Sequence, residues 1–126
     1  MQFASQRQGD VLVAAPVGKI GHPNAQRLQE ALAPILETAV RGGNALVLDF
    51  SGVEYISSMG LRVLLMAAKQ LRAANARIAV AALQPVVKEI FDIARFNHVL
   101  EIFPDVQAAL DQLSGSTPKA KGAAPA

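Results

Sequence analysis

Two adjacent serines hold the position in this sequence where reactive side chains are best placed. Ser57 and Ser58 follow a short apolar run, Ala45 to Phe50, and directly precede a strongly helix-forming stretch. Open parallel sheets keep their functional sites where strands give way to helices. We expect Ser58 to cap the helix, so that a phosphate on it would face unpaired N–H groups and would affect a docking partner without melting the helix. The alternative is that both serines are only helix caps.

The Ser58 hydroxyl could also be a nucleophile, with His22 as its base and Asp49 as the acid that orients the base. A nucleophile elbow, however, has the pattern Gly-x-Ser-x-Gly. Here Ile56 occupies the first glycine position and only Gly60 matches. We therefore expect no enzyme activity and no catalytic residues.

No residue pattern predicts a metal or a cofactor. The chain has no cysteine, and its two histidines, His22 and His98, lack partners at ligand spacing. The nine glycines form neither Gly-x-Gly-x-x-Gly nor a phosphate loop, so nucleotide binding has no support from a motif.

The helix predicted after the serines has an apolar stripe on the face opposite its core leucines. At 100° per residue, this stripe consists of Met59, Val63, Met66 and Gln70. Arg62 and Lys69 flank the stripe, and flexible methionines are common at adaptable protein-binding surfaces. Either a partner protein binds this face or a neighbouring helix of the same chain covers it.

The remaining patterns predict an α/β fold with a small, mainly parallel sheet, an N-terminal hairpin and about four helices. Strands are expected at Phe3–Gln6, Asp10–Val17, Ala45–Phe50, Arg77–Ala82 and around Val99–Phe103. Helices are expected at Ala25–Val40 with Asn24 as its cap, Met59–Ala74, Pro85–Arg95 and from Pro104 or Asp105 to Leu113. The run Ala45–Phe50 should be the central strand, because it is continuously apolar.

Charge and composition narrow the class of protein. Lys119 and Lys121 lie beyond residue 113, and residues 1–113 carry ten basic and ten acidic side chains. A domain with zero net charge and no tryptophan lacks the cationic patch and the stacking surface that nucleic-acid binding requires.

From Ser114 onward no large apolar residue occurs, which predicts a disordered tail after a single domain, residues 1–113. We expect a cytoplasmic protein, since no signal peptide and no membrane-inserting segment are recognisable.

The stretch from Val47 to Leu64, VLDFSGVEYISSMGLRVL, resembles the signature of STAS domains, and more narrowly that of bacterial anti-sigma-factor antagonists. The resemblance continues at 18–20 and 84–94, and covers nearly all of residues 5–113. It implies a partner-switching role in transcription regulation. The unphosphorylated antagonist would bind an anti-sigma factor that is also a serine kinase of the ATPase fold. Phosphorylation of Ser58 would release it, and a PP2C-type phosphatase would reset the cycle.

We expect the partner to bind around the acceptor serine, with Ser57 as the second choice of acceptor. The docking residues predicted in this way are Gly21, His22, Ser57, Met59, Gly60, Arg62, Val63 and Met66.

Three positions depart from the pattern of the family that this sequence resembles. Ser57 stands where an aspartate is usual, Met59 where a second serine or threonine is usual, and Gly21 where well-studied antagonists have an aspartate. The alternative function is a constitutive STAS adaptor, such as a subunit of a lipid or solute transporter, in which no serine is modified. Retention of Ser58 with Gly60 favours the switch, and the missing acidic and hydroxyl groups favour the adaptor.

Overall fold

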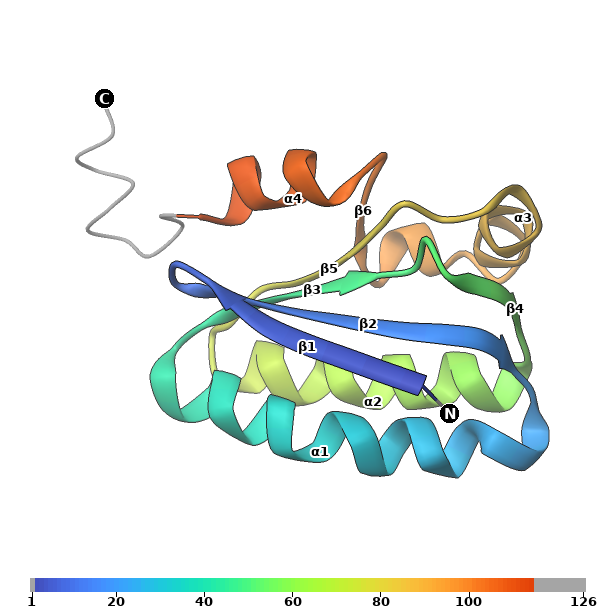
Figure 1. The fold of residues 1–126 in the computed structure, drawn as a ribbon, viewed down its shortest axis with the longest axis horizontal. Coiled ribbons are helices and arrows are strands. Elements are labelled where there is room, and N and C mark those ends of the chain that lie inside the picture. The colour runs from blue at the N-terminus through green and yellow to red at the C-terminus, as the bar shows by residue number, and fades with distance from the viewer. Residues whose placement is uncertain (1, 115–126) are drawn as a thin grey trace.

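A mainly parallel sheet with helices on both faces forms the centre of the computed structural model, which describes residues 2–114 (Figure 1). The strands are β1 (Gln2–Gln8), β2 (Val11–Ile20), β3 (Ala45–Asp49), β4 (Val53–Ile56), β5 (Ile78–Ala81) and β6 (Glu101–Phe103). The helices are α1 (Ala25–Gly42), α2 (Ser58–Ala73), α3 (Pro85–Ile93) and α4 (Val106–Leu113), with short 3₁₀ turns η1 (His22–Asn24) and η2 (Phe96–His98). The predicted fold class is confirmed.

Strand order is β1-β2-β3-β5-β6, and β4 pairs with β2 outside this path. Among the strand pairs of residues 2–114, β1 and β2 are antiparallel, as expected for a hairpin, and the other pairs are parallel. The long strand β2 has two partners in succession. Its first half, Val11–Ala14, pairs with β3, and its end, Gly18–Ile20, pairs with β4. The segment 50–52 separates β3 from β4, and the central position of β3 agrees with its apolar sequence.

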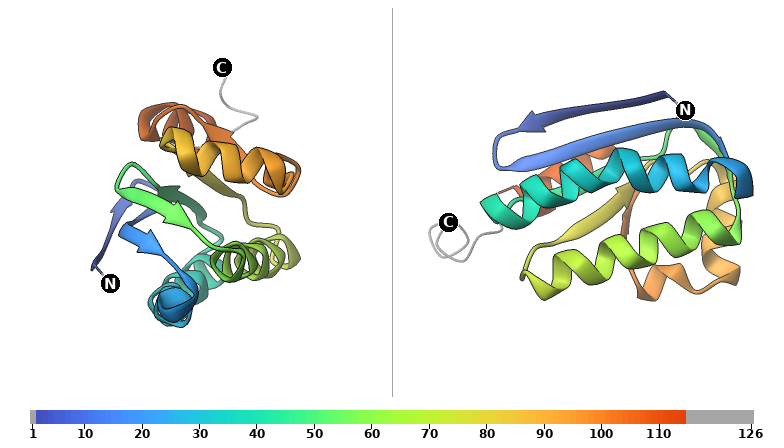
Figure 2. Two further views of the ribbon diagram at one scale, coloured as in Figure 1. Left: turned by 90° about the vertical axis from the view of Figure 1, so that its right-hand side faces the viewer. Right: turned by 90° about the horizontal axis from the view of Figure 1, so that it is seen from below.

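Helices α1 and α2 lie side by side under one face of the sheet, while α3 and α4 lie over the other face (Figure 1). Each of the four begins at the end of the sheet where β2, β4, β5 and β6 terminate, since short connections follow parallel strands (Figures 1 and 2). The helix predicted at Ala25–Val40 extends to Gly42 and stops at Gly43, whose φ of 66° ends the helix in the left-handed conformation.

One strand was not expected from the sequence. Residues Val53–Ile56 form β4, although only its first and last side chains are buried and Glu54 and Tyr55 are exposed. The pattern lacks the alternation that identifies a strand, which explains the omission. The extended piece predicted around Val99–Phe103 is shorter than expected, because η2 precedes it and β6 begins only at Glu101.

The predicted tail falls almost entirely outside the described residues, of which Ser114 is the last and is exposed. Among residues 2–114, no helix combines the length and the apolar character that crossing a bilayer demands.

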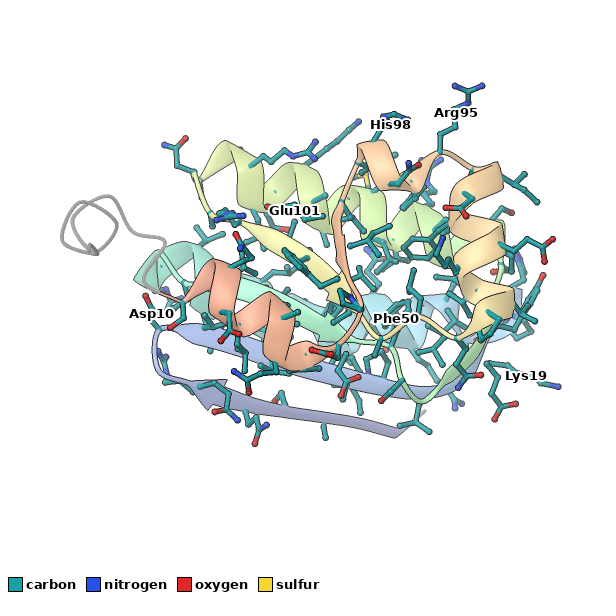
Figure 3. All side chains as sticks on the ribbon, turned by 90° about the horizontal axis from the view of Figure 1, so that it is seen from above. Asp10, Lys19, Phe50, Arg95, His98 and Glu101 are labelled. Atoms are coloured by element: carbon teal, nitrogen blue, oxygen red, sulfur yellow. The ribbon has the colours of Figure 1, made fainter. Side chains whose placement is uncertain are left out.

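Three aromatic rings anchor α3 and the connection that follows it. Phe91 is fully buried, and its ring meets those of Phe50 and Phe96 edge-on at centroid distances of 6.2 and 5.5 Å. Phe50 lies among the interior side chains beside α3 (Figure 3). Edge-to-face pairs of this kind add to the free energy gained by burial alone.

We predict that Phe91→Ala lowers the free energy of unfolding by about 3 to 5 kcal/mol, because a large cavity replaces the ring. Urea denaturation measures the change. Ile93→Ala in the same helix is the matched control: Ile93 is 77% exposed, and its truncation should change stability by less than about 0.5 kcal/mol. Similar losses for the two variants would contradict this account of the α3 anchor.

Candidate functional site

The candidate site lies at the end of the sheet where β2 and β4 terminate and where η1 and α2 begin (Figure 2). A backbone hydrogen bond of 2.8 Å, from the N–H of Ser57 to the carbonyl of Ile20, joins the ends of the two strands. Ser57 is consequently held in an extended conformation, with φ −88° and ψ 172°, directly before the helix. The chain turns into α2 at this point, and the next residue, Ser58, is exposed.

Ser57, and not Ser58, is the N-cap of α2. The Ser57 hydroxyl oxygen accepts a hydrogen bond of 3.2 Å from the N–H of Gly60, which is the geometry of a capping side chain. Ser58 is instead the first helical residue, so the prediction that Ser58 caps the helix is wrong. The physical reason is the extended backbone of Ser57, which an N-cap requires. The cap uses the Ser57 hydroxyl and leaves the one on Ser58 facing outward.

Gly60 permits the first turn of α2 to approach the sheet closely. A Cβ at this position would lie 2.7 Å from Cγ1 of Ile56 and 2.8 Å from Cγ2 of Ile20. Both isoleucines are buried, so neither can move aside freely. A glycine is therefore required here by packing.

The loop before α1 forms the other side of the site. The Asn24 side chain accepts from the N–H of Gly21 at 2.7 Å and donates to the carbonyl of Lys19 at 2.8 Å. Asn24 is the N-cap residue of α1, as predicted, but its side chain makes no hydrogen bond to that helix. It instead fixes the loop that presents His22, and Lys19 points away from the molecule nearby (Figure 3).

A groove of about 1100 Å³ runs between α1 and α2, starting at η1 and the first turn of α2. On the α2 side it is lined by Met59, Arg62, Val63, Met66, Ala67, Lys69 and Gln70. Met59 and Met66 are 40% and 55% exposed, while Val63 is half-buried. Helix α1 thus lies against the flank of the stripe without covering the methionines, and binding of a partner protein to this face stays a prediction.

The structure brings five of the eight predicted docking residues together around this groove: His22, Met59, Arg62, Val63 and Met66 line it. Gly21, Ser57 and Gly60 do not line it, because Gly21 belongs to the loop before α1, Ser57 caps α2 and Gly60 is buried against the sheet. Sequence reasoning missed the wall that α1 contributes. That wall includes Gln26, Gln29, Glu30 and Ala33, whose spacing of three and four residues was the available signal.

The charged residues lining the groove are Glu30 on α1 and Arg62 and Lys69 on α2. The Glu30 carboxylate accepts a hydrogen bond of 3.1 Å from Gln26. Ion pairs within residues 2–114 join Arg41 with Glu37, Arg77 with Glu101 and Lys88 with Asp92, and none of these pairs involves the groove. The open cations give the α2 side of the groove a positive rim.

The arrangement does not assemble a hydrolase triad. The Asp49 carboxylate accepts from the N–H of Ser51 at 3.0 Å and so shapes the turn after β3. Within residues 2–114, no hydrogen bond connects Ser58 with His22 or with Asp49. In the same range, no three histidine or acidic side chains gather as metal ligands would.

Comparison of this sequence with known proteins finds matches to one protein family. Residues 2–109 match the STAS domain. Over 104 residues the chain is 36% identical to BtrV of Bordetella bronchiseptica, a protein named as a candidate anti-sigma factor antagonist, and the match covers 82% of this chain and 84% of that one.

Solved structures show the same fold at low sequence identity. A Thermotoga maritima protein, also named as a candidate anti-sigma factor antagonist, has a TM-score of 0.80 and 18% identity, over 88% of this chain and 93% of that one. The Bacillus antagonist SpoIIAA in its unphosphorylated form has a TM-score of 0.73 and 17% identity, over 90% and 97%. Murine Slc26a9, an anion transporter, has a TM-score of 0.73 and 17% identity, over 86% of this chain but 18% of the transporter.

We predict that the two serines differ in their effect on stability. Ser57→Ala removes the cap and should lower the free energy of unfolding by about 1 kcal/mol. Ser58→Ala at the exposed neighbouring position should change it by less than about 0.5 kcal/mol. Thermal and urea denaturation of both variants test this, and a larger loss for Ser58→Ala would refute the assignment of the cap.

Gly60→Ala should be destabilising by about 1 to 3 kcal/mol because of overpacking, even though alanine is the better helix former. Gly21→Ala is the control, since its Cβ would meet only Cδ of Pro23 at an ordinary 3.5 Å. In a double-mutant cycle with Ile56→Ala, the cost of Gly60→Ala should shrink, because the contact with Ile56 is gone and only that with Cγ2 of Ile20 remains. An unchanged cost would exclude the contact with Ile56 as the cause.

Proposed function

This chain belongs to the STAS domain family, and from that premise we propose that it is an anti-sigma factor antagonist of a bacterial partner-switching pathway. In this proposal the unphosphorylated protein binds an anti-sigma factor that is also a serine kinase of the ATPase fold. Phosphorylation of Ser58 releases it, and a PP2C-type phosphatase removes the phosphate. The protein acts in the cytoplasm, as a binding module without catalytic activity of its own, and binds no nucleic acid.

One observation carries the proposal: an exposed hydroxyl stands at the mouth of an open apolar groove. Ser58 is exposed on the first turn of α2, and the next residue, Met59, lines the groove together with Val63 and Met66. Exposed apolar side chains of this kind suit a protein surface that a partner covers. A charge added to Ser58 would therefore lie at the edge of the docking surface.

The chemistry of the switch would be a simple phosphoryl transfer. The Ser58 oxygen forms a bond to the γ-phosphorus of ATP while the bond to the β-phosphate oxygen breaks, the hydroxyl proton passes to a base of the kinase, and ADP leaves. The phosphate is removed by hydrolysis: the oxygen of a water molecule bonds to the phosphorus, the bond to the Ser58 oxygen breaks, the hydroxyl is regenerated and inorganic phosphate leaves. The added dianion opposes rebinding, because it must be desolvated beside an apolar surface.

The differences from the family's sequence pattern at Ser57 and Met59 are compatible with this role. Ser57 retains the capping function that an aspartate would have at the same place, without the negative charge. Because the first turn of α2 contains no acidic residue, no carboxylate on that turn repels an incoming phosphoryl group. The half-buried, hydrogen-bonded Ser57 is the less accessible hydroxyl, which supports Ser58 as acceptor.

The second candidate function is a constitutive adaptor, in which the same groove docks permanently and no serine is modified. Similarity to the fold of a domain within the Slc26a9 transporter favours this candidate, as do the missing aspartates at positions 21 and 57.

The test is incubation with ATP and a co-encoded ATPase-fold serine kinase, followed by intact mass and peptide mapping. We predict one phosphate, which is lost in Ser58→Ala and retained in Ser57→Asn. The asparagine variant keeps a capping side chain and lacks the hydroxyl, so it separates the chemistry of Ser57 from its structural role.

Binding to the same kinase completes the test. Ser58→Ala should bind permanently in the presence of ATP, while Ser58→Asp should bind more weakly than the wild type. A phosphate lost only in Ser57→Asn would move the acceptor to Ser57. A stable complex without any phosphate would replace the switch with the constitutive adaptor.

A further inference from the structure

We propose that Arg62 binds the phosphate on Ser58 and that phosphorylation thereby withdraws a cation from the groove between α1 and α2. This inference rests on the proposed function, since it concerns the phosphorylated form of the same serine. In this proposal, the arginine one turn beyond Ser58 converts a local modification into a change of charge along the docking surface.

Helix geometry places the two side chains together. Ser58 and Arg62 are four residues apart on α2, which separates them by about 6 Å along the axis and about 40° around it. Both are exposed on the surface of the helix. An anion four residues before a cation is the favourable order for such a pair, because it also agrees with the helix dipole. A phosphate on Ser58 thus comes within reach of the Arg62 guanidinium.

Arg62 is available for this role. The ion pairs found within residues 2–114 do not include it, and the first turn of α2 contains no acidic residue that could compete with the phosphate. Glu30, the acidic residue that lines the groove, belongs to α1 and accepts a hydrogen bond from Gln26 of its own helix. The guanidinium is therefore held by no carboxylate before the modification.

The chemistry of the two groups is well matched. A guanidinium presents a planar fork of N–H donors that fits two phosphate oxygens at once, which an ammonium group cannot do. The backbone N–H groups of Ser58 and Met59 at the start of α2 have no acceptor within the helix and face the same region. The phosphate would thus be stabilised by the helix terminus on one side and by Arg62 on the other.

The pair changes the electrostatics of the groove. Before modification, Glu30, Arg62 and Lys69 give its lining a net positive charge. A phosphoserine adds about 1.5 to 2 negative charges, so the groove and its mouth together become net negative. Because Arg62 is also occupied, a partner with acidic side chains loses its nearest cation. Phosphorylation would therefore act on a partner that never touches Ser58 itself.

The test uses protein with phosphoserine placed at position 58 during synthesis, so that no kinase is involved. His22 also lines this end of the groove, and the titrations are therefore made in a His22→Gln background. Phosphorus NMR measures the second pKa of the phosphate, which is about 6 without neighbours. We expect Arg62→Gln to raise this pKa by about 0.1 to 0.4 units, with Arg62→Lys in between.

Lys69→Gln is the matched control, because Lys69 flanks the same stripe of α2 but lies about 16 Å from Ser58 along the helix axis, compared with about 6 Å for Arg62. It should leave the phosphate pKa unchanged. Equal values with and without Arg62, or equal shifts for Arg62→Gln and Lys69→Gln, would overturn the pairing. Failure of the kinase to modify Ser58 would instead count against the proposed function, so the two results are independent. Urea denaturation checks that each variant is folded.

Discussion

The close contact between the first turn of α2 and the ends of β2 and β4 determines which side chains at the start of α2 are exposed to solvent. It depends on Gly60, because any side chain there would collide with Ile20 and Ile56. With the helix seated this closely, the Ser57 backbone can bond to Ile20 and its hydroxyl can cap the helix. Ser58 has no place in that packing and is directed outward. The exposure of Ser58 thus follows from the close packing of Gly60 and from the use of Ser57 as the cap.

The groove is a consequence of the same parallel architecture. Since α1 and α2 each follow a strand that ends at one edge of the sheet, the two helices start together and run in the same direction (Figure 1). Their buried faces meet the sheet, and the strip between them keeps Met59 and Met66 partly open. The N-terminus of α2, where the N–H groups of Ser58 and Met59 have no acceptor within the helix, lies at the mouth of the groove. An apolar surface and a region favourable to anions therefore adjoin each other.

Much of this arrangement could be predicted from the sequence, because it depends on local patterns. The apolar run at β3 and the leucines of α2 each fix an element and the face that it buries. The choice between Ser57 and Ser58 as cap could not be predicted, since either hydroxyl suits a cap and the decision rests on a bond from Ser57 to a residue 37 positions earlier. The same holds for the wall that α1 adds to the groove. A helical pattern identifies an apolar face but not the distance to the neighbouring helix.

The two successive partners of β2 divide the sheet into parts that differ in their mutual dependence. β3 is bonded on both sides, to β2 and β5, while β4 is paired only with the last residues of β2. The ladder that holds β4 can open without breaking any bond of β3. Regions with few ladder bonds open at lower free energy than the central strands. We therefore expect the amide hydrogens of β4 to exchange with solvent faster than those of β3, although the two strands are neighbours in the sequence.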